Sequence, residues 1–288
     1  MRDYVIYTDS GCDLSPAFLA GEGVSYECLT FRFDGEDKEY KNGEMEAKTF
    51  YDKMREGGVA KTAAINKETF AIAFREILSG GKDILYLGFS SGLSTTFNSA
   101  RLAALELREE YPDAKILVVD TLAASAGQGL LVHLAAEKKR EGADIDACAA
   151  YIESIRLNLC HWFTVDDLVY LKRGGRVSAA AAFFGNALGI KPVMHVDDEG
   201  HLIPVLKVRG RRTAIATMAD KLGESALDLA GGTVYISHGD CMADAETLAS
   251  ILADKYGVHV DHITDVGAVI GAHSGPGTLA LFFLGKQR

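Results

Sequence analysis

The stretch from Ile84 to Thr96 constrains the fold more than any other part of the chain. It begins with Ile84-Leu85-Tyr86-Leu87-Gly88-Phe89, a short apolar run typical of a strand that is buried on both faces. Ser90-Ser91-Gly92-Leu93-Ser94-Thr95-Thr96 follows at once and opens a helical pattern. The sequence therefore predicts a strand, a turn and a helix in succession. Free backbone N–H groups at the helix start favour an anionic oxygen at that turn, whether of a carboxylate, a phosphate or an oxyanion.

The same alternation of strand and helix continues from residue 84 to residue 141. A helical pattern runs from Phe97 to Tyr111, and Lys115 to Val119 reads as another buried strand. A further helix begins near Ser125, where Gly127-Gln128-Gly129 permits close packing of helix on sheet. This order predicts right-handed β-α-β units and a parallel sheet.

The region before residue 84 predicts a mixture of elements. Tyr4 to Tyr7 reads as the first strand of the chain. Val24 to Phe33 reads as one strand that turns back at Asp34-Gly35 into a return leg near Lys38 to Tyr40, so we expect a hairpin. Thr62 falls in the loop that we expect between two helices.

Length and pattern together predict two lobes. With 288 residues, the chain exceeds the size at which one hydrophobic core usually stops growing. An amphipathic helix from Asp144 to Leu159 ends the first lobe, and a hairpin of Pro192–Val196 with His201–Val208 marks a different pattern beyond it. We therefore predict an α/β fold, with a mostly parallel sheet and flanking helices in residues 1–158 and a mixed α/β domain in residues 159–288.

Composition and charge exclude several classes of function. The formal net charge of −10 disfavours binding to nucleic acid or to an anionic membrane, because both need a broad basic surface. No 18 consecutive apolar residues occur and the N-terminus enters a strand at once, so we expect a cytoplasmic protein without an integral membrane segment. The five cysteines are widely spaced, as is typical of reduced thiols. His259 and His262 would point to opposite faces of a strand, which disfavours a metal site.

One motif suggests a hydrolase. Gly88-Phe89-Ser90-Ser91-Gly92 matches the G-x-S-x-G nucleophile elbow, and a triad could combine Ser90 with His273 and an acid such as Asp240 or Asp265. The chain has no upstream oxyanion loop of the His-Gly-Gly-Gly type, and it offers too few clear strands before residue 84 for that fold. A serine hydrolase is therefore the alternative reading.

Two turns carry most of the clustered positive charge. Arg173 to Arg176 and Arg209 to Arg212 are rich in arginine and contain glycine, and arginine forks bind phosphate or carboxylate in a bidentate manner. They suggest a phosphorylated ligand, such as a sugar or nucleotide phosphate, or an acidic partner surface. A glycine-rich corner from Gly267 to Gly277 holds His273 and Ser274, which could complete an anion site.

Several motifs in this order resemble those of the DegV family of fatty-acid-binding proteins. The resemblance runs nearly from end to end and is carried by Thr8-Asp9-Ser10, Thr62, Ser90 to Thr96, Asp120 with Gly127-Gln128-Gly129, Leu171 to Ser178, the Arg209 turn and Val269 to Gly277. It implies a two-lobe protein that holds one long-chain fatty acid, such as palmitate or oleate, in a buried tunnel and uses no cofactor. Such a protein is a carrier rather than an enzyme, and serves as the acyl carrier subunit of bacterial fatty-acid kinase systems.

The resemblance also implies roles for single residues. Thr62 and Ser94 would bind the fatty-acid carboxylate and His273 would join the same network, while Arg173 and Arg209 would help to present the head group to the kinase catalytic subunit. That kinase would form acyl phosphate, and an acyltransferase of phospholipid metabolism could use the product. Two departures concern the head group: Thr62-Ala63-Ala64-Ile65-Asn66 replaces a usual Thr-Ser-x-Pro-Ser, and Thr95 replaces a usual glycine.

A simple estimate agrees with a weakly polar head-group site. Burying about 15 methylenes at roughly 0.8 kcal/mol each gives on the order of 12 kcal/mol before the costs of association. The head group then needs orientation more than binding strength. Candidate tunnel-lining residues are Phe31, Phe33, Phe89, Phe183, Phe184, Leu188 and Ile190.

Overall fold

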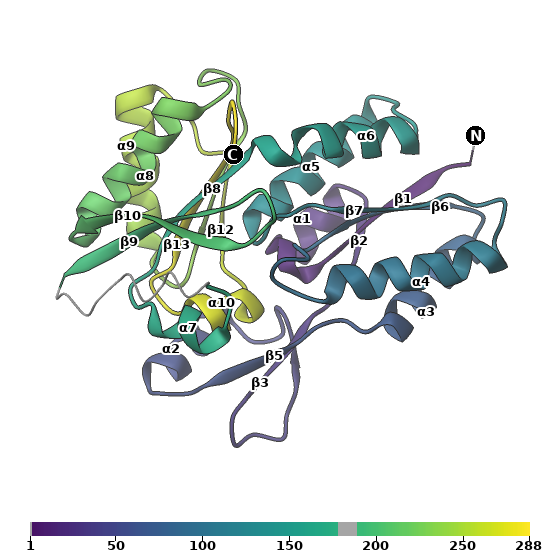
Figure 1. Cartoon of the computed structure of the whole chain (residues 1–288), viewed down its shortest axis with the longest axis horizontal. Helices are drawn as coiled ribbons and strands as arrows, with labels where there is room; N and C mark the ends of the chain where they lie inside the picture. Colours follow the sequence, from purple (N-terminus) through teal and green to yellow (C-terminus); the bar gives the residue numbers. More distant parts are fainter. Residues whose placement is uncertain (1, 178–188) are drawn as a thin grey trace.

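The protein has two lobes with a β-sheet in each, and a small third sheet beneath them (Figure 1). We describe a computed structural model that covers residues 2–177 and 189–288. The predicted α/β fold with a parallel N-terminal sheet and a mixed C-terminal sheet is confirmed. The tunnel candidates Phe183, Phe184 and Leu188 lie outside the described residues.

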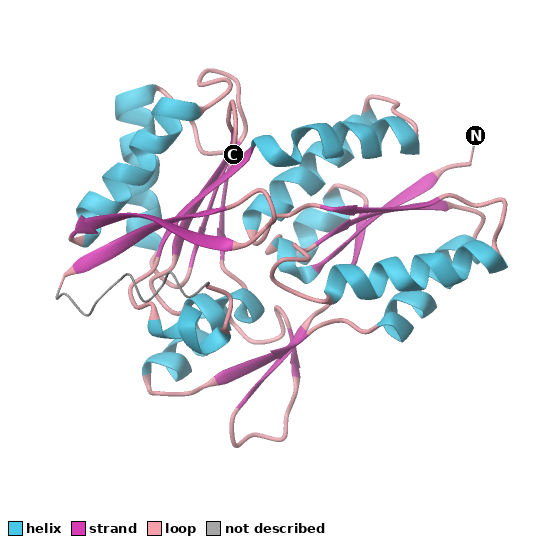
Figure 2. Ribbon diagram, viewed as in Figure 1, coloured by secondary structure: helices cyan, strands magenta, loops and turns pink. Residues whose placement is uncertain are grey.

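The N-terminal sheet has the strand order β2-β1-β6-β7, and every pair in it is parallel. Its strands are β1 (Tyr4–Asp9), β2 (Val24–Glu27), β6 (Asp83–Gly88) and β7 (Ile116–Asp120). Helices cover both faces, which explains why all six residues of β6 are buried (Figure 2). On one side lie α1 (Pro16–Gly21), α5 (Ala126–Arg140) and α6 (Ile145–Ile155), and on the other α3 (Lys67–Ser79) and α4 (Thr96–Glu110).

Side chains of β6 alternate between these two helical layers. Leu85 and Leu87 pack in the core that includes α5 and α6, whereas Ile84 and Tyr86 pack in the core that includes α3 and α4. The strand, turn and helix predicted at residues 84–96 are thus present, with the turn at the carboxyl end of the sheet.

Two expectations for the region before residue 84 are wrong. Val24 to Phe33 is not one strand, because β3 (Thr30–Phe33) belongs to a separate antiparallel sheet with β4 (Tyr40–Lys41) and β5 (Ala60–Ala63). The break follows from a side-chain contact: the Ser10 hydroxyl accepts the Leu29 N–H at 3.0 Å, so the chain leaves the main sheet there. Thr62 lies within β5 rather than in a loop.

The C-terminal sheet is mixed and has the order β10-β9-β8-β13-β11-β12. Its strands are β8 (Leu159–Thr164), β9 (Ile190–Val196), β10 (Leu202–Arg209), β11 (Val234–His238), β12 (His262–Asp265) and β13 (Leu279–Leu284). The predicted hairpin is the antiparallel pair β9 and β10. The outer face packs on α8 (Arg211–Ser225) and α9 (Met242–Tyr256), and the inner face turns toward the N-terminal lobe (Figure 1).

Contacts from both lobes hold this inner face in place. Tyr51 of α2 (Ala47–Arg55) donates its hydroxyl hydrogen to the Val266 carbonyl at 2.7 Å, and the Thr264 hydroxyl donates to the Asp13 carbonyl at 2.9 Å. Arg55, also in α2, pairs with Asp240 after β11. These contacts connect the N-terminal lobe to the C-terminal sheet and its loops.

Within residues 2–177 and 189–288, no helix combines the length and apolarity needed to cross a membrane.

Candidate functional site

A cavity of about 160 Å³ lies between the two lobes. A single water molecule needs only roughly 10–15 Å³ of such volume, so this space accommodates a substantial ligand. Its wall is mostly apolar and includes Leu29, Phe89, Leu93, Phe163, Leu171, Val196, Leu202, Val269, Ile270 and Phe282. Among the tunnel candidates from sequence, Phe89 lines the cavity. Phe31 and Phe33 instead pack against Phe50 in the core, with ring centroids 5.2 and 5.6 Å from it.

The two-residue period of the C-terminal sheet explains which of its side chains reach the cavity. His161 and Phe163 of β8 line it, whereas Trp162 between them packs on the outer core with α8. Ala280 and Phe282 of β13 line it in the same way, as does Ser237 of β11. A one-residue shift in register would exchange this lining for the outer core.

Thr62 and His273 meet at one end of the cavity. The Thr62 hydroxyl lies 2.8 Å from Nε2 of His273, although 211 residues separate them in sequence. Thr62 comes from β5 and His273 from α10 (Ala268–Ser274). The structure thus brings together two of the three residues expected at the head group, and both line the cavity.

Burial keeps the His273 imidazole neutral. It lowers the pKa of His273 to about 4, and the nearby positive charge of Arg176 acts in the same direction. In one tautomer, Nε2–H donates to the Thr62 hydroxyl, whose own hydrogen is then free to point to an acceptor in the cavity. Nδ1 faces Gly174, where a Cβ would collide with the ring. The imidazole can therefore orient the Thr62 hydroxyl as a donor to a ligand oxygen.

Ser94 lines the same cavity just before α4. Its hydroxyl lies 2.9 Å from the Thr96 hydroxyl and accepts the Thr96 N–H at 3.2 Å, so Ser94 also supports the helix start. Thr95 lines the cavity too, with φ −75° and ψ −4°, an ordinary helical conformation. Threonine in place of glycine therefore costs no backbone strain here. The helix dipole of α4 favours an anion at this end.

Arg176 is a site residue that the sequence reasoning did not single out. It is the only charged side chain among the described residues that line the cavity. Its Nε donates to the Leu93 carbonyl at 3.2 Å and its Nη1 to the Gly174 carbonyl at 2.6 Å, which fixes the guanidinium. The sequence signal for Arg176 was its position in the basic run from Arg173 to Arg176.

Ser274 adds a buried hydroxyl near the same end. It is 5% exposed and lines the cavity. Its oxygen has no hydrogen-bond partner among the residues that the structure describes. An unpaired buried hydroxyl beside a cavity is available to a ligand. The sequence motif contained Ser274, but only the unpaired atom distinguishes it from a structural serine.

The two remaining predicted site residues lie elsewhere. Arg173 is exposed on α7 (Val169–Gly174), with its guanidinium 5.8 Å from the centroid of the Tyr170 ring. Arg209 is exposed at the end of β10. Neither side chain lines the cavity. Their predicted role at a partner surface stays a prediction.

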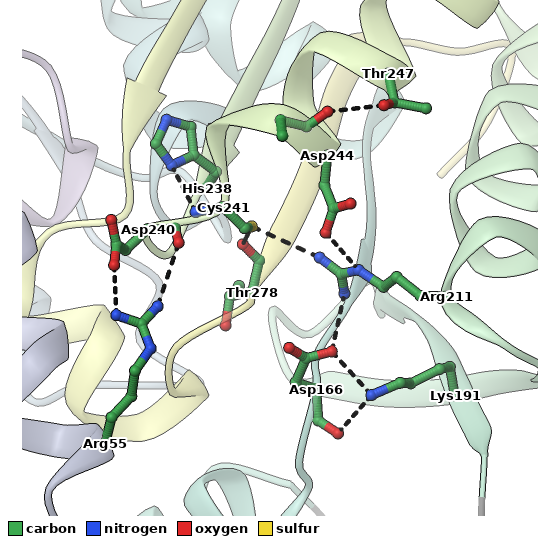
Figure 3. A network of polar contacts seen from close by, with 11 residues as sticks. Arg55, Asp166, Lys191, Arg211, His238, Asp240, Cys241, Asp244, Thr247 and Thr278 are labelled. Carbon is green, nitrogen blue, oxygen red and sulfur yellow. Dashed lines mark hydrogen bonds and ion pairs between the residues drawn. The ribbon is translucent and has the colours of Figure 1, made fainter.

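The Arg209 turn does not form an open phosphate site. Figure 3 shows Arg211 directed toward Asp244 and Asp166, with Nε 2.8 Å from the Asp244 carboxylate and Nη1 3.8 Å from Asp166. Lys191 also pairs with Asp166, at 2.8 Å. This network ties α8 to α9 and to the segment after β8. The arginine is therefore committed to structural ion pairs, which disfavours a sugar- or nucleotide-phosphate site there.

The geometry does not support Ser90 as a nucleophile. Ser90 is 0% exposed, and its hydroxyl donates to the Gly200 carbonyl at 2.9 Å. The same oxygen accepts the Gly92 N–H at 3.2 Å. His273, the proposed base, instead contacts Thr62. Ser90 therefore holds the β9–β10 hairpin loop against the turn after β6.

The described part of the chain contains no group of three or more His, Cys, Asp or Glu side chains placed to hold a metal ion. The five cysteines are free thiols. The functional groups of the cavity are thus hydroxyls, imidazoles and one guanidinium. Such a set can bind and orient an anionic oxygen next to an apolar chain.

Comparisons with known proteins agree with this arrangement. The family model described as "Uncharacterised protein, DegV family" matches residues 3–286. The chain belongs to the DegV family. A DegV domain-containing protein of Clostridium perfringens is 43% identical over 289 residues, which cover 100% of this chain and 99% of that relative.

Solved DegV structures share the fold over almost the whole chain. A DegV family protein from Thermus thermophilus, described by its fatty acid binding, matches with a TM-score of 0.89 at 31% identity. The match covers 99% of this chain and 100% of that chain. DegV from Bacillus subtilis, described as a fatty acid binding protein, matches with a TM-score of 0.86 at 26% identity, over 99% and 100% of the two chains.

Proposed function

We propose that this DegV protein binds one long-chain fatty acid in the cavity between its lobes. The observation that carries the proposal is the cavity itself, whose wall is mostly apolar and which brings Thr62, Ser94, Arg176 and His273 to one space. Thr62, Ser94 and Ser274 would direct hydroxyls to the carboxylate there, with His273 behind Thr62 and Arg176 supplying positive charge. The fatty acid binding described for two similar DegV proteins supports the same conclusion.

The acyl chain and the head group contribute different amounts of binding free energy. An acyl chain of about 15 methylenes contributes on the order of 12 kcal/mol when it leaves water, before association costs. A hydrogen bond to a charged group adds only about 1.5–3 kcal/mol. The chain therefore provides most of the affinity, and the head-group residues decide which end faces outward.

We further propose that the protein presents this carboxylate to a separate kinase catalytic subunit, which forms acyl phosphate. The cavity offers the neutral imidazole of His273 and several hydroxyls, and the Ser90 hydroxyl is hydrogen-bonded to a backbone carbonyl. We therefore assign the protein the role of a carrier. Arg173 and Arg209 are exposed and carry positive charge on a protein with a formal net charge of −10. They would contact the kinase, and an acyltransferase would use the product.

Titration of lipid-free protein with radiolabelled oleate tests the binding proposal. We expect saturable uptake with one fatty acid per chain. Short-chain carboxylates such as butyrate should not compete, because they retain the head group and lose most of the buried methylenes. Saturable binding of butyrate with no binding of oleate would overturn the proposal.

A further inference from the structure

His161 places a hydrogen-bonding atom in the apolar part of the cavity, away from the head-group residues. Its side chain lines the cavity from β8 and is 2% exposed. Its Nε2 atom is buried and has no hydrogen-bond partner within the described residues. Phe163 lies on the same face of β8, and Phe282 packs edge-on to the imidazole with centroids 5.5 Å apart. An unpaired imidazole between two phenyl rings is not needed to hold an unbranched hydrocarbon chain.

The free atom of His161 is an acceptor. Nδ1 lies 3.2 Å from the Leu159 carbonyl oxygen, so Nδ1 carries the proton and Nε2 carries the lone pair. Burial lowers the pKa of His161 well below its ordinary value, and the positive charge of Arg288 acts in the same direction. The ring is therefore neutral at physiological pH, and a partner for Nε2 has to donate a hydrogen.

Sheet register gives the depth of this acceptor. In the antiparallel pair of β8 and β13, His161 lies opposite Phe282, and Thr164 lies opposite Leu279 at the start of β13. The short loop before Leu279 leads back to α10 and His273. His161 thus lies three residues, or about 10 Å, further along the sheet than the end that faces the head-group residues.

We propose that the cavity prefers an acyl chain that carries a hydrogen-bond donor, a hydroxyl group, part of the way along its length, and that Nε2 of His161 accepts that hydrogen. This inference rests on the proposed fatty-acid binding. A plain chain leaves Nε2 buried without a partner, which costs free energy, whereas a hydroxyl at the matching carbon satisfies both groups. Sites built around a buried polar group discriminate strongly against ligands that leave it unpaired.

The wild-type protein provides the first test. Lipid-free protein is titrated with stearic acid and with a series of monohydroxystearic acids that differ only in the position of the hydroxyl. We expect one narrow range of positions to bind roughly tenfold more tightly than stearic acid. Hydroxyls on either side of that range should weaken binding, because they are buried without an acceptor.

The His161→Leu variant tests whether this residue is the acceptor. The preference for the hydroxylated chain should disappear, while binding of stearic acid is retained or improves. His195→Leu is the matched control, because His195 is a buried imidazole on the neighbouring strand that stacks on Trp162, at 4.2 Å between centroids, and does not line the cavity. It should keep the wild-type preference.

The outcomes separate this inference from the proposal on which it rests. Binding of stearic acid with no preferred hydroxyl position would overturn the inference and leave fatty-acid binding intact, and Nε2 would then hold only water. A preference that survives in His161→Leu would also overturn it, with the Ser125 and Ser237 hydroxyls, 3.0 Å apart on the same cavity wall, as the alternative acceptors. If no acid of the series binds, both the inference and the proposed function fail.

Discussion

Replacing Thr62 with valine removes one hydroxyl and leaves the shape of the side chain almost unchanged. In the proposed complex, this hydroxyl donates to the fatty-acid carboxylate and accepts from Nε2 of His273, which lies 2.8 Å away. Valine has the same branching as threonine, and it suits the strand position of Thr62 in β5. The change therefore tests the hydrogen bond and not the fold of the strand.

The expected size of the effect follows from the charge of the ligand. A hydrogen bond to a charged group contributes about 1.5–3 kcal/mol, and each 1.4 kcal/mol corresponds to tenfold in Kd. Thr62 is half-buried, so the lower end of this range applies and we expect Kd to rise roughly tenfold. The buried methylenes are untouched, so the dependence of affinity on chain length should not change.

Displacement of a fluorescent fatty acid by oleate measures this Kd. Thr30→Val is the control, because Thr30 lies on β3 directly opposite Ala63 and contacts Glu39 rather than the cavity. The reasoning is refuted if Thr62→Val weakens oleate binding no more than Thr30→Val does. A loss of affinity in Thr62→Val that varies with the length of the fatty acid would also contradict the reasoning, because the mutation would then have altered the wall of the cavity.

Three further predictions test neighbouring parts of the account. Ser94→Ala should weaken oleate binding and lower the folding stability by about 1 kcal/mol, because the start of α4 loses the hydrogen bond from the Thr96 N–H to the Ser94 hydroxyl. Ser15→Ala is the control, because it removes the cap of α1 away from the cavity. It should lower the stability in thermal melts and leave oleate binding unchanged. The double variant Arg173→Glu, Arg209→Glu should bind oleate as the wild type does. It should reduce the formation of acyl phosphate by a fatty-acid kinase catalytic subunit with ATP, measured by trapping the product with hydroxylamine. Rates equal to those of the wild type would show that neither arginine contributes to binding of the kinase. Burial lowers the pKa of His195 to about 4. Between pH 6.5 and pH 4 the unfolded chain therefore takes up a proton that the folded protein does not, and the free energy of unfolding should decrease as the pH is lowered through that window, by up to about 3 kcal/mol from this residue. Denaturant titrations of His195→Phe should show a shallower decrease, and an unchanged slope would contradict the assignment.

The regular parts of the fold were predictable because their signals are local. The run Ile84 to Phe89 is apolar throughout since both faces of its strand are covered. Asparagine is a common capping residue, and Asn66 caps α3 by accepting the Thr69 N–H at 2.8 Å. The break between β2 and β3 was not predictable in this way. It depends on Ser10 binding the Leu29 N–H, a contact between residues 19 positions apart.

The site was predictable in part, and for a similar reason. The resemblance to a family pointed to Thr62, Ser94 and His273, which the structure places around one cavity. Arg176 and Arg173 are indistinguishable in a short basic run, and only the path of the chain after α7 directs Arg176 to the cavity. Whether an apolar residue lines a cavity or fills a core depends on packing across the whole interface between the lobes.

Native mass spectrometry of the purified protein tests the central claim most directly. The spectrum should show a population heavier than the bare chain by the mass of one long-chain fatty acid. Extraction with organic solvent should release that acid and convert the heavier population to the lighter one. A protein that carries no lipid, and that takes up no long-chain fatty acid when one is supplied, would contradict the account.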